Sequence, residues 1–394
     1  MSADRLWAIA AAVLLTAVSF WWFPGHTILQ SDTQVYIPIL QHLENPAVLA
    51  QDAMAARPHV AFTLYDEVVL GLRRATGLSF EWLLMGQQVL FRALGIFGVF
   101  LLARAAGLNP AMSFAVAALL ALGATVNGPQ VLTVEYEPVP RGFAFGLVLL
   151  SLGLLAGESW TGAALACTAA FAYHPPTALI VWVMMAGLCV LERRWREMAV
   201  LLAGPGLIAL SVFTQPGASE ALGLATRIPA DLETILRMRA SYNWVDTWIG
   251  KYWLHFAVLL VAALVGAWRV RLAVGWPVRA FLWVLPVTGA LSVAVSWLVL
   301  EQSKWLVGPQ FQPARYLMYV PFFAALSCAL AGLRAASSGR VWEAAAFLLV
   351  PLLVPLSPDV FAVSWSAAGL AAVLAFAMAF ARRPGVAVAP AVLA

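Results

Sequence analysis

The chain has 394 residues, of which 63% are hydrophobic and 11% charged, with a net charge of +4 and a mean hydropathy of +0.87. Soluble domains carry about 25% charged residues because their surfaces must face water, so this composition excludes a water-facing globule and favours a membrane protein. So small a net charge gives no support to nucleic-acid binding, which uses strongly basic surfaces.

Apolar runs follow one another along almost the whole chain. A full membrane crossing needs about 20 such residues, so the shorter runs predict tilted or broken helices. We expect an all-α polytopic protein with about twelve transmembrane helices, in one domain over 1–383, and a short flexible tail at 384–394. The runs lie at about 6–23, 83–103, 111–126, 142–156, 161–173, 176–191, 198–213, 253–268, 280–299, 315–333, 341–355 and 361–380.

Arginines mark the short connections on one side of these predicted helices. By the positive-inside rule this side is cytoplasmic, together with both termini. The other side receives two long loops, 24–82 and 214–252, and two shorter segments, 127–141 and 300–314. The excess of Arg over Lys is typical of a GC-rich bacterial genome, so we expect the cytoplasmic membrane of a bacterium. The inner arginines are Arg5, Arg104, Arg193, Arg194, Arg196, Arg269, Arg271, Arg279, Arg334, Arg340, Arg382 and Arg383.

The first outer loop is unusually rich in polar side chains for so apolar a chain. Within "SDTQVYIPILQHLENPAVLAQDAMAARPHV" it carries Asp32, Asp52, Arg57 and His59. The stretches "TQVYIPILQHL" and "FTLYDEVVLGLRRATG" have the mixed apolar and polar character of helices that lie in the membrane interface. Two such helices would hold Asp32 at a fixed depth. A simpler interpretation of "SDTQ" is that Asp32 only caps the helix that follows.

Further polar residues come from later outer segments and from one junction between helices. Arginine suits phosphate oxygens, aromatic rings suit a sugar or lipid, and a carboxylate suits a general base. The pattern therefore predicts an outer-face site for an anionic, partly apolar substrate. Simpler interpretations are solvated glutamates, arginines that snorkel at helix ends and a histidine that caps a broken helix. These candidates are Glu135, Glu137, Arg141, His174, Arg239, Tyr242, Lys304, Gln312 and Arg315.

Several of these stretches, taken in order, resemble the GT-C superfamily of polytopic glycosyltransferases, which use polyprenyl-phosphate sugars. The resemblance lies in "SDTQVYIPIL", where Tyr36 follows the outer Asp32 by four residues. It continues through "EYEPVPRGFAFGLVLLSLGLL", "FAYHPPTALIVWV" and "GPQFQPARYLMYVPFFAAL", which together extend over most of the chain.

The resemblance implies an inverting glycosyl transfer at the outer face, with Asp32 as the base. Asp52 matches the second acid of the family's first loop, which assists or contacts a metal, so Mg²⁺ or Mn²⁺ is the candidate cofactor. Arg315 and Arg239 match the residues that meet the lipid phosphate. Many members carry a soluble C-terminal domain where we expect only a short tail, so a lipid, a glycan and a protein all stay open as acceptors.

Two other functions compete with an enzyme. A transporter or flippase of a lipid-linked or anionic solute should place ionisable residues within its spans, and Arg92 is the clearest case. No internal repeat supports this alternative. A scaffold protein would not need acids and bases that converge from several loops.

Overall fold

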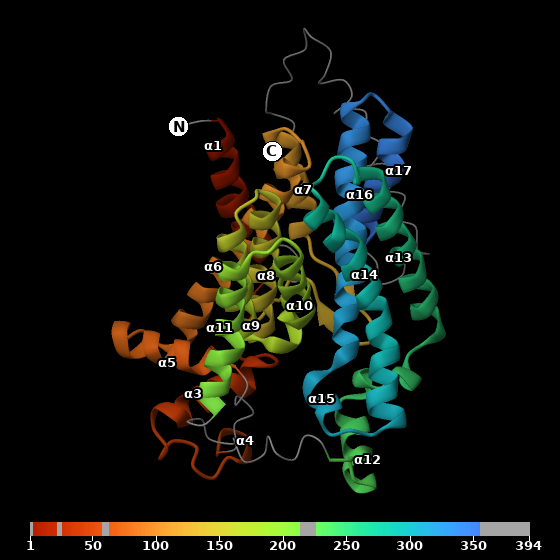
Figure 1. Ribbon diagram of the computed structural model, residues 1–394. Coiled ribbons are helices and arrows are strands. Elements are labelled where there is room, and N and C mark those ends of the chain that lie inside the picture. Colours follow the sequence, from red (N-terminus) through yellow and green to blue (C-terminus); the bar gives the residue numbers. More distant parts are fainter. Residues whose placement is uncertain (1–2, 22–25, 57–62, 213–225, 355–394) are drawn as a thin grey trace.

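The computed structural model of the protein describes residues 3–21, 26–56, 63–212 and 226–354. Figure 1 shows long helices side by side, with short elements at the lower end. Within this described part, four helices are long and apolar enough to cross a membrane, and shorter apolar helices accompany them. The protein is thus an all-α membrane protein. The four helices are Phe80–Ala105, Gly250–Val270, Trp276–Gln302 and Val307–Ser337.

The first half of the chain supplies one side of the bundle. Its elements are α1 (Ala3–Ala10), the π-helix η1 (Ala11–Leu15), α2 (Thr16–Trp21), α3 (Thr33–Glu44), α4 (Ala53–Ala56), α5 (Tyr65–Thr76), α6 (Phe80–Ala105), α7 (Pro110–Ala121), β1 (Thr125–Val126), β2 (Val131–Leu132), α8 (Pro140–Ala156), α9 (Trp160–Tyr173), α10 (Pro175–Leu191) and α11 (Trp195–Val212). Strands β1 and β2 form an antiparallel hairpin in which Thr125 pairs with Leu132.

The second half begins with short elements and ends with a buried helix. After α12 (Ala230–Arg239) and the 3-10 turns η3 (Ser241–Asn243) and η4 (Val245–Thr247) come α13 (Gly250–Val270), α14 (Trp276–Ser296), the π-helix η5 (Trp297–Gln302), α15 (Val307–Phe311), η6 (Pro313–Met318), α16 (Tyr319–Ser337) and α17 (Val341–Leu353). Helix α16 packs against α13, α14 and α17, which explains why nearly all its side chains are buried.

The predicted apolar runs up to 341–355 coincide with helices over their described residues. The run at 111–126 ends early as a helix, because Gly123 adopts φ +74° and turns the chain into β1. Helices α3 and α5 confirm the two helices expected in the first outer loop. The predicted run at 361–380 and the tail lie outside the described residues.

Glycines bring α6 and α8 into close contact. A Cβ atom at Gly98 would lie 2.2 Å from the carbonyl oxygen of Leu149, and one at Gly146 would lie 2.3 Å from that of Phe91. Small residues at such crossings let helix backbones approach closely in membranes. This contact fixes α8, whose first turn carries Arg141, against α6.

We expect Gly98→Ala to destabilise the protein by about 1–3 kcal/mol, because the new methyl group must push two backbones apart. Thermal unfolding in detergent measures the loss. Gly86→Ala is the matched control on the same helix, since no atom lies within 4 Å of its added Cβ. Equal unfolding temperatures for the two variants would contradict the proposed close contact.

Candidate functional site

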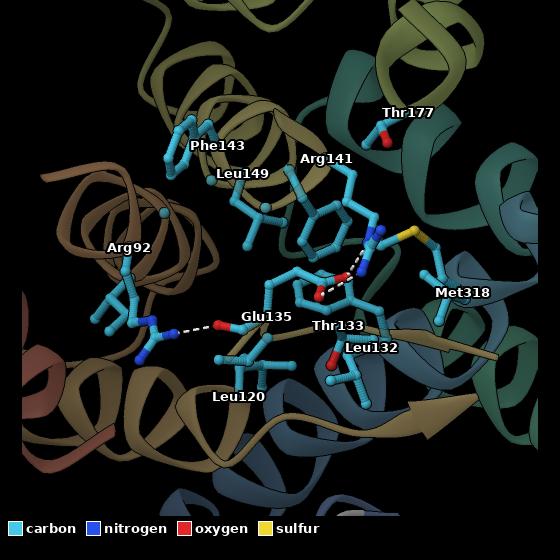
Figure 2. Close-up of a pocket in the computed structure, with 18 of the residues that line it drawn as sticks. Arg92, Leu120, Leu132, Thr133, Glu135, Arg141, Phe143, Leu149, Thr177 and Met318 are labelled. Atoms are coloured by element: carbon cyan, nitrogen blue, oxygen red, sulfur yellow. Dashed lines mark hydrogen bonds and ion pairs between the residues drawn. The ribbon is translucent and has the colours of Figure 1, made fainter. Parts of the chain in front are cut away.

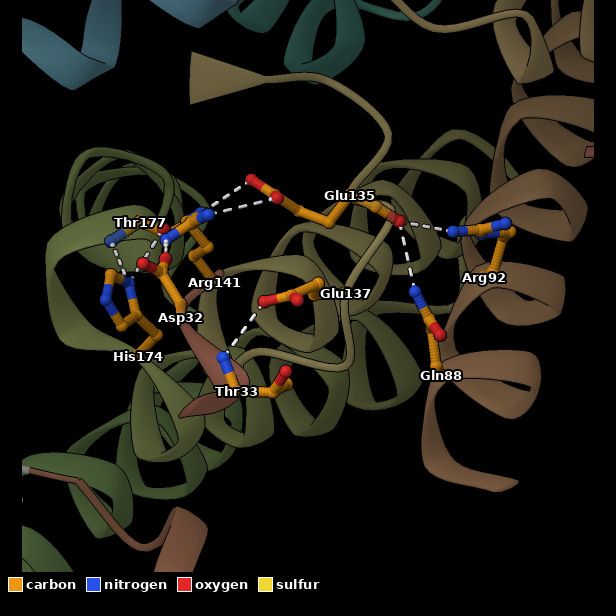
Figure 3. Close-up of polar contacts among 9 residues, drawn as sticks. All are labelled: Asp32, Thr33, Gln88, Arg92, Glu135, Glu137, Arg141, His174 and Thr177. Carbon is orange, nitrogen blue, oxygen red and sulfur yellow. Dashed lines mark hydrogen bonds and ion pairs between the residues drawn. The ribbon is translucent and has the colours of Figure 1, made fainter. Parts of the chain in front are cut away.

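Arg141 joins two acidic side chains that are distant in the sequence. Its guanidinium binds Glu135 through Nε–Oε1 at 2.6 Å and Nη2–Oε2 at 3.1 Å, and its Nη1 donates to Oδ2 of Asp32 (Figure 3). The exposed fraction is 6% for the Glu135 side chain, 19% for Arg141 and 43% for Asp32. The three groups thus run from the interior to an open face at Asp32.

The local sequence places Arg141 in the first turn of α8, where its positive charge is unfavourable unless acidic side chains compensate it. Pro140 occupies the first turn of α8, a position that suits proline because its missing N–H has no partner there. Arg141 follows directly, so its charge lies at the positive end of the helix dipole, which is unfavourable. Glu135 and Asp32 compensate that charge, because both carboxylates contact the guanidinium directly.

Asp32 is held as a carboxylate. Its side chain makes no capping hydrogen bond to α3, so the interpretation of Asp32 as a simple helix cap is wrong. Burial opposes ionisation of Asp32, but the charge and hydrogen bond of Arg141, with the charge of Arg315, outweigh it and lower the pKa. Asp32 is therefore ionised at neutral pH, and its exposed fraction leaves it open to a second partner.

Glu137 holds the turn that carries Asp32. Its carboxylate accepts hydrogen bonds from the backbone amides of Gln30 at 3.0 Å, Ser31 at 2.7 Å and Thr33 at 2.9 Å. Glu137 is 2% exposed and Glu135 is 7% exposed, so the interpretation of both as solvated side chains is wrong. These three backbone N–H hydrogen bonds use the Glu137 carboxylate to hold the turn, so we assign Glu137 a positioning role.

We expect Glu137→Gln to loosen this turn, because an amide NH₂ group would face at least one backbone N–H that now has an acceptor. Leaving a buried donor unsatisfied costs about 1–3 kcal/mol. Hydrogen exchange of the peptide covering 29–34 should accelerate by about tenfold or more. Glu158→Gln, at an exposed position, is the control. Unchanged exchange in Glu137→Gln would contradict the role given to Glu137.

His174 lies between α9 and α10 and lines the pocket beside Arg141 that is described below. The Pro175–Pro176 pair ends α9, and the His174 side chain accepts from the amide of Thr177, as the capping interpretation predicts. Burial, with the charges of Arg315 and Arg141, lowers the pKa of His174 to about 3. The imidazole is therefore neutral at physiological pH. Nearby, burial raises the pKa of Tyr36 on α3, which keeps its phenol neutral.

Arg315 of η6 also lies at this site. Its guanidinium carbon lies 5.8 Å from the ring centroid of Tyr242 in η3. Among the described residues Arg315 forms no ion pair, and its buried Nε has no hydrogen-bond partner. Arg141 is paired with two carboxylates, whereas Arg315 forms no ion pair with a described residue and keeps donors for a further anion.

A mostly apolar pocket of about 990 Å³, open solvent included, lies beside Arg141 (Figure 2). Arg92 from α6 lines it and donates to the backbone carbonyl of Glu135, which also accepts from Gln88 Nε2 at 3.1 Å. Sequence reasoning did not include Arg92 or Gln88 in the site. A charged residue inside an apolar span was the available signal for Arg92.

Some predicted residues lie elsewhere. Asp52 is exposed and accepts from the amides of Met54 and Ala55, so it caps α4. Lys304 pairs with Glu233 at 2.7 Å. Neither lines the pocket.

The other predicted residues fall into three groups. Arg239 is exposed on the last turn of α12, outside the pocket lining. Gln312 precedes η6 at φ +49°, and its carbonyl accepts from the amide of Arg315 at 3.0 Å. Arg57 and His59 lie outside the described residues.

Within the described ranges no three His, Cys, Asp or Glu side chains are grouped as a metal site would require. No protein-family model, curated protein or solved structure matches the chain. Function must therefore be argued from the geometry around Arg141.

Proposed function

We propose that the protein is a glycosyltransferase that moves a sugar from a polyprenyl-phosphate donor to an acceptor at the outer face of the cytoplasmic membrane. The observation that carries this proposal is the pairing of an ionised, partly exposed carboxylate, Asp32, with an arginine that has unused donors, Arg315. Arg141 and Arg315 both line the apolar pocket, and Asp32 reaches it through its contact with Arg141. A base, an anion site and apolar walls are the three parts that this reaction needs.

In the proposed reaction the acceptor hydroxyl attacks the anomeric carbon from the face opposite the phosphate, and the C–O bond to the lipid phosphate breaks. Asp32 takes the hydroxyl proton, and the departing phosphate keeps the bonding electrons. Arg315 stabilises the charge that develops on that phosphate. Because the leaving group is an acidic phosphate, no strong general acid is required. Arg141 and Arg315 lower the pKa of Asp32, so the carboxylate is ionised at neutral pH, and its partly exposed side chain leaves one side open to the acceptor hydroxyl.

The wider proposal follows the resemblance to GT-C enzymes. In it the protein has about twelve transmembrane spans, both termini lie in the cytoplasm, and the site faces the periplasm. The acceptor is a lipid, a glycan or a protein. A divalent cation remains a candidate cofactor, with no ligand set assigned.

Transfer of radiolabelled sugar from a panel of polyprenyl-phosphate sugars tests this function in membranes that contain the overexpressed protein. Wild type should label a lipid, glycan or protein product with one donor. Arg315→Gln should both raise the KM for that donor and lower kcat, because the proposed phosphate contact forms on binding and strengthens as charge develops on the leaving phosphate. Membranes without the protein set the background. Absence of labelling with every donor, in membranes that supply all three acceptor classes, would contradict the proposal.

Transport of a lipid-linked anion is the second candidate, because Arg92 lies within a predicted span and lines the same apolar pocket. Flux of the labelled lipid into proteoliposomes separates the two functions. A transporter should move the lipid without cleaving its sugar–phosphate bond, and Asp32→Asn should leave that flux measurable.

A further inference from the structure

A second hollow lies at the start of α13 and the end of α14, at the lower end of both helices in Figure 1. Its lining shares no residue with the pocket beside Arg141. The floor is apolar and consists of Ala290, Val293 and Ala294 from α14, with Val245 beside them. We call it the tryptophan groove, because Trp248, Trp253 and Trp297 also line it.

The three indoles present aromatic surface to this groove. Trp253 is 48% exposed and Trp297 is 42% exposed. The Trp248 and Trp253 rings lie 5.9 Å apart at 40°, and the Trp248 indole N–H donates to the carbonyl of Tyr242 at 3.1 Å. Trp248 is therefore fixed in place rather than free to fold over the groove. Aromatic faces at a membrane interface bind lipid head groups, and several faces together attract a cation.

One carboxylate at the end of the groove lacks a cation. Asp246 is paired with Arg237 at 2.9 Å, and their charges cancel. Glu301 Oε1 accepts from the backbone amide of Asp246 at 3.1 Å, but within the described part of the chain no Lys or Arg forms an ion pair with Glu301. Neither Lys nor Arg is among the residues that line the groove. The groove therefore carries one carboxylate that has no ion pair among the described residues beside its aromatic faces, and Arg237 acts on it only as a nearby charge.

We propose that the tryptophan groove binds a phospholipid whose head group carries an ammonium group. The ammonium lies against Glu301 and the indole faces, and an acyl chain follows the apolar floor along α14. Charge decides the occupant: an anionic head group would approach Glu301 with no lysine or arginine in the lining to offset the repulsion. This inference does not depend on the proposed glycosyl transfer.

Native mass spectrometry of the full chain in detergent tests the inference, with dioleoyl phosphatidylethanolamine and dioleoyl phosphatidylglycerol as separate probes. Wild type should bind phosphatidylethanolamine more tightly. Glu301→Gln and Trp297→Ala should each weaken that binding by about tenfold, the factor expected for one lost cation contact. Binding of phosphatidylglycerol should not weaken in Glu301→Gln, because this substitution removes the charge that repels an anionic head group.

Two matched variants serve as controls. Asp231→Asn removes an exposed acid on α12, and Trp342→Ala removes an indole that is 77% exposed on α17. Both should bind phosphatidylethanolamine as wild type does. If Glu301→Gln disturbs the turn at Asp246, the exposed Trp297→Ala still tests the groove. Equal affinity of wild type for the two lipids would overturn the inference. The inference would also be overturned if wild type formed a dimer without bound lipid and Trp297→Ala dissociated it, because the groove would then be a subunit interface.

Discussion

Replacement of Asp32 by Asn should reduce glycosyl transfer by about 10²–10⁴-fold, which is the usual contribution of a general base. The substitution keeps the size of the side chain and a hydrogen-bond acceptor for Arg141, so the loss should fall on kcat rather than on the donor KM. The initial rate of sugar transfer at saturating donor measures it. Asp231→Asn removes an exposed acid on α12 and should leave the rate unchanged. Full activity of Asp32→Asn would remove Asp32 from the mechanism.

The pH dependence of transfer follows from the same carboxylate. Arg141 and Arg315 lower the pKa of Asp32, so the base is ionised at every pH above the ordinary range for aspartate. His174, with a pKa of about 3, stays neutral over that range. We therefore expect kcat/KM to be level from neutral pH down to about pH 5 and to fall only below the usual aspartate pKa. An acid limb near pH 6.5 would instead indicate an ordinary histidine as the base.

The second large effect concerns stability. Arg141→Met should destabilise the protein by about 3–5 kcal/mol, because it leaves the carboxylate of Glu135 buried without its partner. Unfolding in a series of detergent mixtures gives this free energy. Arg196→Met, at an exposed position on the first turn of α11, should change stability little.

A double variant tests the cause of that loss. Adding Glu135→Gln to Arg141→Met removes the uncompensated charge, so the double variant should be more stable than the sum of the single losses by about 0.5–3 kcal/mol. Strict additivity would show that Glu135 and Arg141 contribute independently, against the ion pair seen here.

The helices could be predicted from sequence because apolar runs and interfacial helices are local patterns. The partners of Arg141 could not, because Asp32 lies 109 residues away and meets Arg141 only through tertiary packing. "SDTQ" favoured a cap, but the contact with a cation prevailed over that local preference. Lys304 was expected in the outer-face site, yet Glu233, 71 residues earlier, binds its ammonium.

The sequence shows that Arg92 is a charged residue within an apolar run, but its role depends on which residues it contacts in the folded protein. Arg92 was noticed only as an argument about transport, whereas its guanidinium supports the carbonyl of Glu135 and rests on the ring of Phe20 at 4.1 Å. A sequence alone does not reveal which face of α6 meets the 125–139 segment. Asp52 illustrates the opposite error, since an acid in the expected loop performs a local capping task.

The three hydrogen bonds from backbone amides to the Glu137 carboxylate also determine when the site can form during synthesis. Gln30 and Glu137 are 107 residues apart, and both α6 and α7 lie between them. A ribosome that has completed α6 has thus produced Asp32 but not the acceptor that holds its turn. The segment after α7 must be synthesised before the turn gains its partner. A nascent chain that ends before Glu137 therefore carries the proposed base without the geometry that would let it act.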